Sequence, residues 1–271
     1  KEVHETPGTE FIIVATEFLT GETFNDFTSA HDPVRVDTYY GVPHYWKKRY
    51  RTFQLAQQRA RAVWHLSQSQ IEPYRLATGC PQIHYLPHGY VEGFARIRHK
   101  PDAHKDIDAV FTGALTHHRT QVVETLQARG LRVLATKPLN VAQREDLVAR
   151  SKIALNIRQS SQWRYPSNSR YHYHLSNDSL LVSEHCAVAC DLSRYVIESG
   201  EEDFVDRCCE AVTQQAWVSN ARRRRELFMS EMPMGTLMGQ LLEATYAEDA
   251  PHPGQEAASS DWAPGDRGVT A

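Results

Sequence analysis

The chain has 271 residues, a formal net charge of -3 and 41% hydrophobic residues. This length exceeds the needs of one small domain and suits two lobes with a tail. The near-neutral charge argues against a general nucleic-acid binder, whose domains are usually basic. No apolar run approaches the roughly 18 residues of a membrane span, and the polar first residues do not resemble a signal peptide, so we expect no integral membrane segment. The arginine run at 222–225 is interpreted as a solvated helix face, with a phosphate patch as the alternative.

The chain contains five cysteines, an odd number. This count fits free thiols in a reducing compartment better than a disulfide framework, so we expect a cytoplasmic location. His185, Cys186 and Cys190 lie close together in the sequence, but their spacing matches no strong zinc signature. We therefore predict no metal site.

The first 95 residues predict a short α/β lobe. The expected strands cover residues 11–15, 62–66 and 83–86, and the expected helices cover residues 50–61 and 69–76. Brief apolar runs of this kind are typical of strands that are buried on both faces. We assign residues 1–95 to an N-terminal acceptor-side lobe, which we expect to be reduced or truncated, and the polar residues 96–106 to a linker.

A cleaner alternation of strands and helices follows the linker. The expected strands cover residues 107–112, 131–135, 153–157 and 180–183, and the expected helices cover residues 118–129, 141–150, 170–176, 202–214 and 219–229. This rhythm indicates a parallel sheet with crossover helices. We assign residues 107–247 to a C-terminal lobe. Residues 248–271, rich in proline, glycine and serine, are interpreted as a disordered tail.

Parallel sheets of this kind bind ligands beyond the carboxyl ends of their strands. The segment from Thr112 to Arg119 joins such a strand end to a helix. Gly113 allows a close approach of the backbone, and the amino end of the helix favours phosphate. Arg119, in the first helical turn, can offer a charged fork to a diphosphate. An ordinary tight turn is the alternative interpretation.

A second candidate site lies between Arg170 and Glu184. Glu184 ends an expected strand, where a carboxylate can accept two hydrogen bonds from a ribose diol. The alternative is that Glu184 caps the following helix or pairs with a surface cation.

Three motifs, taken in order, resemble one known family. Residues 108–119, 151–157 and 170–184 resemble the C-terminal domain of the spore-maturation-protein-like glycosyltransferases, which are of the group 1 type with a GT-B fold. The resemblance covers about half of the chain. It implies an α/β protein with two Rossmann-like lobes and parallel sheets, of which the N-terminal lobe is short here. It also implies a nucleotide-sugar donor, with no metal and no other cofactor. The residues expected to bind the donor are Thr112, Gly113, Arg119, Asn156, Arg158, Arg170, Tyr171, Ser183 and Glu184.

The chain departs from the family pattern at two places. Tyr173 stands where the family has a glutamate, and Asn177-Asp178 replaces the usual pair of glycines. Asparagine and aspartate tolerate left-handed backbone conformations, so the turn can be kept. In related retaining enzymes the missing glutamate lies near the donor sugar. Its loss favours an alternative function, that of a non-catalytic or degenerate nucleotide-sugar-binding protein that acts with a partner.

The N-terminal lobe is expected to supply the acceptor site. Transfer to a hydroxyl group benefits from a general base. Glu17 directly follows an apolar strand and His88 lies near the expected cleft, so these two are the candidate catalytic residues, with a structural role as the alternative for each. Trp163 and Tyr165 can stack on a base or a sugar, or they belong to an ordinary packed loop.

These features favour a glycosyltransferase of the hexosyltransferase type. It would move a sugar from a nucleotide-sugar donor to an unknown small-molecule or glycan acceptor. A different Rossmann-like enzyme, such as an epimerase, is disfavoured because no G-x-G-x-x-G fingerprint follows a strand. We expect no nucleic-acid partner, and we leave a homo-oligomer open.

Overall fold

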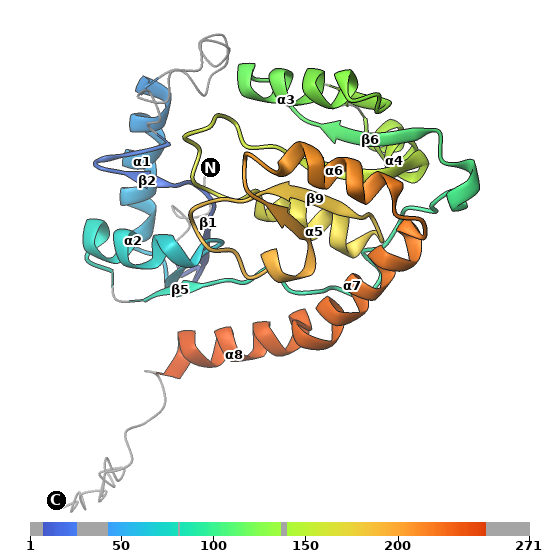
Figure 1. The fold of residues 1–271 in the computed structure, drawn as a ribbon. Helices are drawn as coiled ribbons and strands as arrows, with labels where there is room; N and C mark the ends of the chain where they lie inside the picture. Colours follow the sequence, from blue (N-terminus) through green and yellow to red (C-terminus); the bar gives the residue numbers. More distant parts are fainter. Residues whose placement is uncertain (1–7, 26–42, 81, 137–139, 248–271) are drawn as a thin grey trace, which may run out of the picture.

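The computed structural model describes residues 8–25, 43–80, 82–136 and 140–247. Within these ranges the chain forms two α/β lobes, each built around a parallel sheet (Figure 1). None of the helices in the described part of the chain has the length and apolar character that a membrane crossing requires. The expected disordered tail lies outside the described residues.

The first lobe contains a three-stranded parallel sheet with the order β1-β4-β5. Its elements are β1 (Ile12–Ala15), the hairpin strands β2 (Leu19–Thr20) and β3 (Thr23–Phe24), α1 (Pro43–Gln57), β4 (Ala62–His65), α2 (Ile71–Thr78) and β5 (Ile83–Tyr85). The sequence predicts the three sheet strands and both helices, but the first helix begins seven residues earlier than the expected range 50–61. It does not predict the hairpin, because strands of two residues carry no periodicity.

Strand β4 is buried on both faces, which explains its continuous apolar run. Val63 packs with Tyr74 of α2 on one face. On the other face, Trp64 packs against Leu241 of α8 (Met234–Tyr246). Since successive side chains of a strand point to opposite faces, helices cover this small sheet on both sides.

The second lobe contains a five-stranded parallel sheet with the order β10-β9-β8-β6-β7. Its strands are β6 (Ile107–Thr112), β7 (Val133–Thr136), β8 (Ser151–Asn156), β9 (Leu181–Glu184) and β10 (Ile197–Ser199). Its helices are α3 (His117–Ala128), α4 (Val141–Arg150), α5 (Asn168–Ser176), α6 (Phe204–Thr213) and α7 (Trp217–Glu231). The alternating pattern predicts each of these elements except β10, a three-residue edge strand that is only partly buried.

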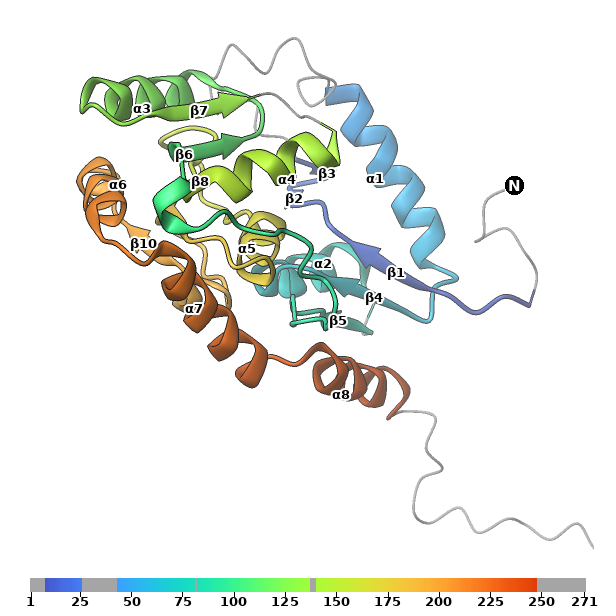
Figure 2. The same ribbon diagram turned by 90° about the vertical axis from the view of Figure 1, so that its right-hand side faces the viewer.

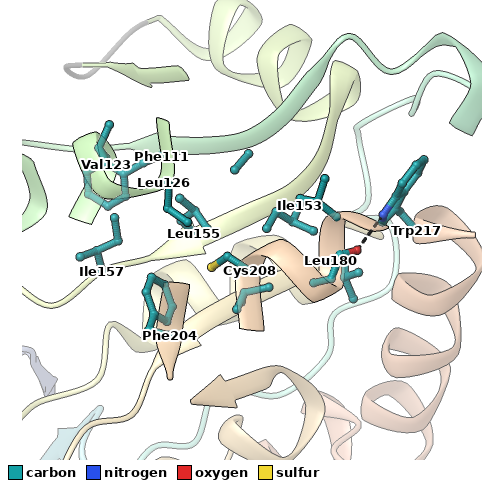
Figure 3. Packing of buried hydrophobic residues seen from close by; sticks show 14 of the residues in the cluster. Phe111, Val123, Leu126, Ile153, Leu155, Ile157, Leu180, Phe204, Cys208 and Trp217 are labelled. Carbon is teal, nitrogen blue, oxygen red and sulfur yellow. Dashed lines mark hydrogen bonds between the residues drawn. The ribbon is translucent and has the colours of Figure 1, made fainter. Parts of the chain in front are cut away.

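Two apolar layers cover the two faces of this second sheet. On one face, Phe111 packs in a cluster with Leu126 of α3 and Phe204 of α6 (Figure 3). On the other face, Val110 belongs to a cluster with Phe228 of α7. Val110 and Phe111 are neighbours in β6, so both layers follow from the alternation of a single strand. The layers hold the carboxyl ends of the strands in fixed positions beside one another.

Helix α8 packs on the first lobe, whereas the sequence analysis assigned residues 107–247 to one lobe. Tyr90 and Pro233 form a parallel bridge at the point where the chain leaves α7, and α8 continues toward the first sheet (Figure 2). Trp64 Nε1 donates a hydrogen bond of 3.0 Å to Thr245 Oγ1, and Thr245 is fully buried. The reason for the difference is that the apolar side of α8 covers the face of the first sheet opposite α2.

The expected linker, residues 96–106, is fixed to the second lobe by side chains. Asn177 Oδ1 accepts a hydrogen bond of 2.8 Å from the backbone of Arg96. Lys105 is buried, and its Nζ donates to the carbonyl of Ser151 at 2.7 Å. Burial lowers the pKa of Lys105 to about 8. The polar residues of this segment therefore act as anchors to the second lobe.

The arginine run at 222–225 does more than form a solvated helix face. Arg225 and Arg222 lie 3.1 and 4.0 Å from Asp178 Oδ2, while Arg224 donates to the carbonyl of Val196 at 3.1 Å. Asp178 has a φ of 52°, the left-handed conformation that the sequence analysis expected this turn to allow. Two of the arginines thus attach α7 to the turn between α5 and β9.

Two histidines with lowered pKa values, His99 and His174, should make the stability of the fold depend on pH. Burial lowers the pKa of His99 to about 4 and that of His174 to about 3, whereas both groups take up a proton near pH 6.5 in an unfolded chain. Between these values the unfolded state binds more protons than the folded state. We therefore expect the free energy of unfolding to fall as the pH is lowered from about 6.5 toward 4, by up to about 1.4 kcal/mol per histidine and pH unit.

Urea denaturation at about pH 7.5 and at about pH 5 measures this dependence. His99→Gln removes one of the buried groups, so its stability should fall less on acidification than that of the wild type. His104→Gln, at an exposed position nearby, is the matched control and should keep the wild-type dependence. Equal pH dependence in all three proteins would contradict the assignment to buried histidines.

Candidate functional site

A cavity of about 410 Å³ lies between the two lobes, at the carboxyl ends of both parallel sheets. The first lobe contributes the segments that follow β1, β4 and β5, among them Thr16, Ser67 and His88. The second lobe contributes the segment after β8 and the first turns of α3 and α5, among them Arg119 and Arg170. This is the edge at which α/β sheets bind ligands.

The charged side chains that line this cavity, among the described residues, are positive. Arg119, Arg158 and Arg170 line it, together with His65 and His88. Among the described residues that line it there is no aspartate and no glutamate. Guanidinium groups bind phosphates and carboxylates through charge-assisted hydrogen bonds. The cavity is therefore suited to an anionic ligand.

Arg170, in the first turn of α5, is held by neutral groups. Its Nη1 donates to Asn156 Oδ1 at 2.8 Å and its Nη2 donates to the carbonyl of Thr112 at 3.2 Å. The guanidinium also lies over the ring of Phe111, 5.0 Å from its centroid. No carboxylate of the described residues lies within ion-pair distance of it. Burial lowers the pKa of Arg170 to about 10, which still leaves the group charged at neutral pH.

Arg119 and Arg158 are engaged more fully by the protein. Arg119 donates from Nε to the carbonyl of Ile157 at 3.0 Å and from Nη1 to that of Ala114 at 2.9 Å. Arg158 forms an ion pair with Glu201. The sequence analysis expects the guanidinium of Arg119 to bind a diphosphate. In the structure this group instead connects the loops that follow β6 and β8. Its main contribution to a ligand is positive charge at the cavity wall.

Gly113 leaves room for the guanidinium of Arg170. A Cβ atom at this position would lie 2.9 Å from Arg170 Nη2 and 3.2 Å from the Phe111 ring, and contacts below 3.0 Å force a neighbour to move. Sequence analysis expected Gly113 to allow the approach of a ligand. The structure instead shows the approach of a side chain that lines the cavity, while Gly113 itself does not line it.

Gly113→Ala should displace the guanidinium of Arg170 and weaken the binding of anions in the cavity. We expect a loss of affinity for a nucleoside diphosphate of about tenfold, the value of one charge-assisted hydrogen bond. Isothermal calorimetry measures it. Gly235→Ala is the matched control, because a Cβ at Gly235 meets nothing within 4 Å. Equal affinity in Gly113→Ala and the wild type would show that the contact is unimportant.

Glu184 ends β9 as expected, but its carboxylate is buried and occupied. It is 1% exposed and does not line the cavity. The backbone N–H of Arg158 donates to Oε2 at 2.6 Å, and His118 Nε2 lies 2.9 and 3.1 Å from the two carboxylate oxygens. Here the carboxylate connects the loop after β8 with the first turn of α3.

The remaining residues expected to bind the donor form a network behind the cavity wall. Tyr171 and Ser183 are fully buried, and their hydroxyl oxygens lie 2.5 Å apart. Asn156 donates to Ser183 Oγ at 2.9 Å. Thr112 takes part only through its carbonyl, which accepts from Arg170. The expected donor residues that line the cavity are Arg119, Asn156, Arg158 and Arg170.

The two candidate bases lie in different surroundings. His88 lines the interlobe cavity, and burial, with His172 nearby, lowers its pKa to about 4, so its imidazole is neutral and able to accept a proton at pH 7. Glu17 does not line this cavity. Its carboxylate lies 2.8 Å from Arg49 and accepts from Asn25 at 2.6 Å. The structure thus brings His88, and not Glu17, to the arginines.

Aromatic and polar contacts join the lobes at the cavity rim. Phe18 of the first lobe stacks on Tyr165 of the second, with ring centroids 4.0 Å apart. Asn168 Nδ2 donates to the carbonyl of Leu66 at 3.0 Å. Trp163 and Tyr165 both line the cavity, as expected for rings that stack on a ligand, whereas Tyr173 does not. No local pattern identifies Phe18 or Asn168, because both act through contacts between distant segments.

Comparison with known proteins finds structural relatives only. No protein-family model matches the chain, and no curated protein matches it in sequence. TarM matches with a TM-score of 0.50 and 9% identity, over 74% of this chain and 46% of that chain. A variant of S. aureus TarM, in complex with fondaparinux, alpha-GlcNAc-glycerol and UDP, matches with a TM-score of 0.52 and 11% identity, over 74% and 47%. A glycosyltransferase from Rickettsia africae matches with a TM-score of 0.49 and 8% identity, over 70% and 64%.

TarM is a GT-B glycosyltransferase. The chain has a GT-B-type fold. It spans less than half the length of either TarM structure. The expected fold class, α/β with two Rossmann-like lobes and parallel sheets, is confirmed. Because one fold supports many functions, the activity has to be argued from the cavity.

Proposed function

We propose that the chain binds a nucleotide sugar in the interlobe cavity and transfers the sugar to an acceptor held by the first lobe. The observation that carries this proposal is a cavity whose described lining residues include three arginines and no carboxylate, at the carboxyl ends of both sheets of a GT-B-type fold. A structurally similar protein, the TarM variant, is in complex with UDP, a ligand whose diphosphate matches the charge of this cavity.

Within the GT-B group we propose the spore-maturation-protein-like type. The three motifs that carry the resemblance fall on β6 with the start of α3, on β8, and on α5 with β9. Each of them leads to a residue at the cavity wall or directly behind it. The three motifs occur in the order of the family pattern, and they lie together at one cavity. Both observations support the proposed type.

The residues at the cavity suggest how transfer proceeds. The acceptor oxygen forms a bond to the anomeric carbon of the donor sugar, while the bond from that carbon to the diphosphate oxygen breaks and its electron pair remains on the diphosphate. Arg170 and Arg119 stabilise the charge that develops there, so we propose that no metal is required. His88 takes the proton of the acceptor hydroxyl.

The second candidate function is a nucleotide-sugar-binding protein without catalysis that acts with a partner. Two observations favour it. Tyr173, which replaces the family's glutamate, does not line the cavity. In addition, the stacked rings of Phe18 and Tyr165 close part of the rim between the lobes. Release of UDP, GDP or TDP from a donor by the purified protein in the presence of acceptors would exclude this candidate.

Calorimetry with UDP, GDP and TDP tests the donor site. We expect one of them to bind the wild type, and Arg170→Gln to weaken that binding by about tenfold or more, because a hydrogen bond to a charged group contributes about 1.5–3 kcal/mol. Arg223→Gln removes an exposed arginine of α7 and should bind like the wild type. The donor assignment fails if none of the three nucleotides binds.

His88→Asn tests the proposed base. Transfer should slow by about 10²–10⁴-fold while the affinity for the nucleotide stays unchanged, since general base catalysis acts on the chemical step. Because burial holds the pKa of His88 near 4, the wild-type rate should not fall between about pH 7 and pH 6 through protonation of this group. The exposed His104→Asn serves as the control. An unaltered rate in His88→Asn would remove His88 from the mechanism.

A further inference from the structure

A continuous series of hydrogen bonds leads from the cavity wall into the second lobe and ends on a carboxylate. Arg170 Nη1 donates to Asn156 Oδ1 at 2.8 Å, and Asn156 Nδ2 donates to Ser183 Oγ at 2.9 Å. Ser183 Oγ lies 2.5 Å from the hydroxyl of Tyr171, which donates to Glu198 Oε1 at 2.9 Å. Glu198 is on β10, the strand that sequence analysis did not predict.

The carboxylate at the end gives these bonds a direction. An ionised carboxylate can only accept hydrogen bonds, so the Tyr171 hydroxyl donates its single proton to Glu198. Tyr171 must then accept from Ser183, and Ser183 must accept from the amide of Asn156. The carbonyl of Glu184, 2.9 Å from Ser183 Oγ, competes for the serine proton at a longer distance. With the hydrogen bonds in this direction, only one orientation of the Asn156 amide gives both of its ends a partner. Its NH₂ faces Ser183 and its oxygen faces Arg170.

The groups between the two charged ends are neutral. Asn156 is 3% exposed, and Ser183 and Tyr171 are fully buried, so a misdirected donor in this series would be left without a partner at a cost of about 1–3 kcal/mol. Glu198 also accepts from Ser193 Oγ at 2.6 Å, which fixes the carboxylate on the side of β10. Arg170 is thus oriented through neutral groups, and its charge remains available to a ligand.

We propose that Asn156, Ser183, Tyr171 and Glu198 form a positioning relay that holds the guanidinium of Arg170 in the cavity without neutralising it. The proposal rests on the proposed function, in which Arg170 faces the diphosphate of the donor. Asn156 supplies the acceptor for Arg170. The other three residues orient Asn156 and do not touch the ligand, so Glu198 acts on the donor site from the far end of the relay.

The substitution Asn156→Asp places a carboxylate beside the guanidinium at nearly the same volume. Calorimetry should show that the affinity for UDP and for inorganic pyrophosphate falls by about tenfold or more, because the new ion pair competes with the ligand. Because the substitution also removes the amide donor to Ser183, the affinities are compared well below the thermal midpoint of each variant. Asn140→Asp is the matched control: its side chain caps α4 by accepting from Gln143 N–H and does not line the cavity, so this variant adds the same charge outside the cavity lining and should bind like the wild type.

A second variant interrupts the relay without adding charge. Tyr171→Phe removes the hydroxyl between Ser183 and Glu198, and we expect the affinity for UDP and pyrophosphate to fall by about threefold, the value of one neutral hydrogen bond. Tyr195→Phe removes another buried tyrosine hydroxyl, which donates to Glu231 outside the relay, and should leave both affinities unchanged.

The results separate the relay from the donor site itself. If the wild type binds no nucleoside diphosphate and no pyrophosphate, the proposed function fails and the relay with it. If the wild type binds, but Asn156→Asp and Tyr171→Phe bind as tightly, the relay is overturned while the donor site stands. Equal losses in Asn156→Asp and Asn140→Asp overturn the relay as well, because net charge then explains them.

Discussion

The positive charge of Arg170 is the constraint on which the interlobe cavity depends. Removing a guanidinium from water costs free energy unless other groups replace the lost hydration. Among the described residues, Arg170 obtains this replacement from an amide oxygen, a backbone carbonyl and an aromatic face. These groups satisfy hydrogen bonds but leave the charge uncancelled. The wall of the cavity therefore keeps a positive charge at this position.

The surroundings of Arg170 explain several other residues. Gly113 lacks a side chain because the guanidinium lies where its Cβ would reach. Phe111 belongs to the core cluster of the second lobe and also lies beneath the guanidinium. Core packing and the charged wall of the cavity therefore share one side chain. A site built in this way gains its precision from the rigidity of the sheet below it.

The sequence predicts the sheet strands of both lobes well, except for the edge strand β10, because apolar runs and their alternation with helices depend on local patterns. It also predicts the segments that meet at the cavity, since strand ends of parallel sheets share an edge. It does not predict which side chains at those ends reach the cavity. Glu184 and Arg170 lie in the same stretch of sequence, yet the first is closed off by His118 and Arg158 while the second lines the cavity.

Partners from distant segments decide such cases. His118 is 66 residues away from Glu184, and Glu198 is 27 residues away from Tyr171. No local sequence pattern encodes these pairs. A role that is predicted from residue type alone therefore leaves out the partner that occupies the side chain. For the same reason the sequence does not predict α8 as a helix, and its position in the chain places its residues in the second lobe, although Leu241 of α8 packs against Trp64 of the first.

The return of α8 to the first sheet also has a consequence for synthesis. The bond from Trp64 to Thr245 joins residues 181 positions apart, so one apolar face of the first sheet stays uncovered until nearly all of the described chain has left the ribosome. Domains usually fold in order as they emerge, and exposed apolar surface at that stage favours aggregation. The second lobe can complete its own layers while the first waits. The burial of this face of the first sheet therefore depends on the last helix of the described chain.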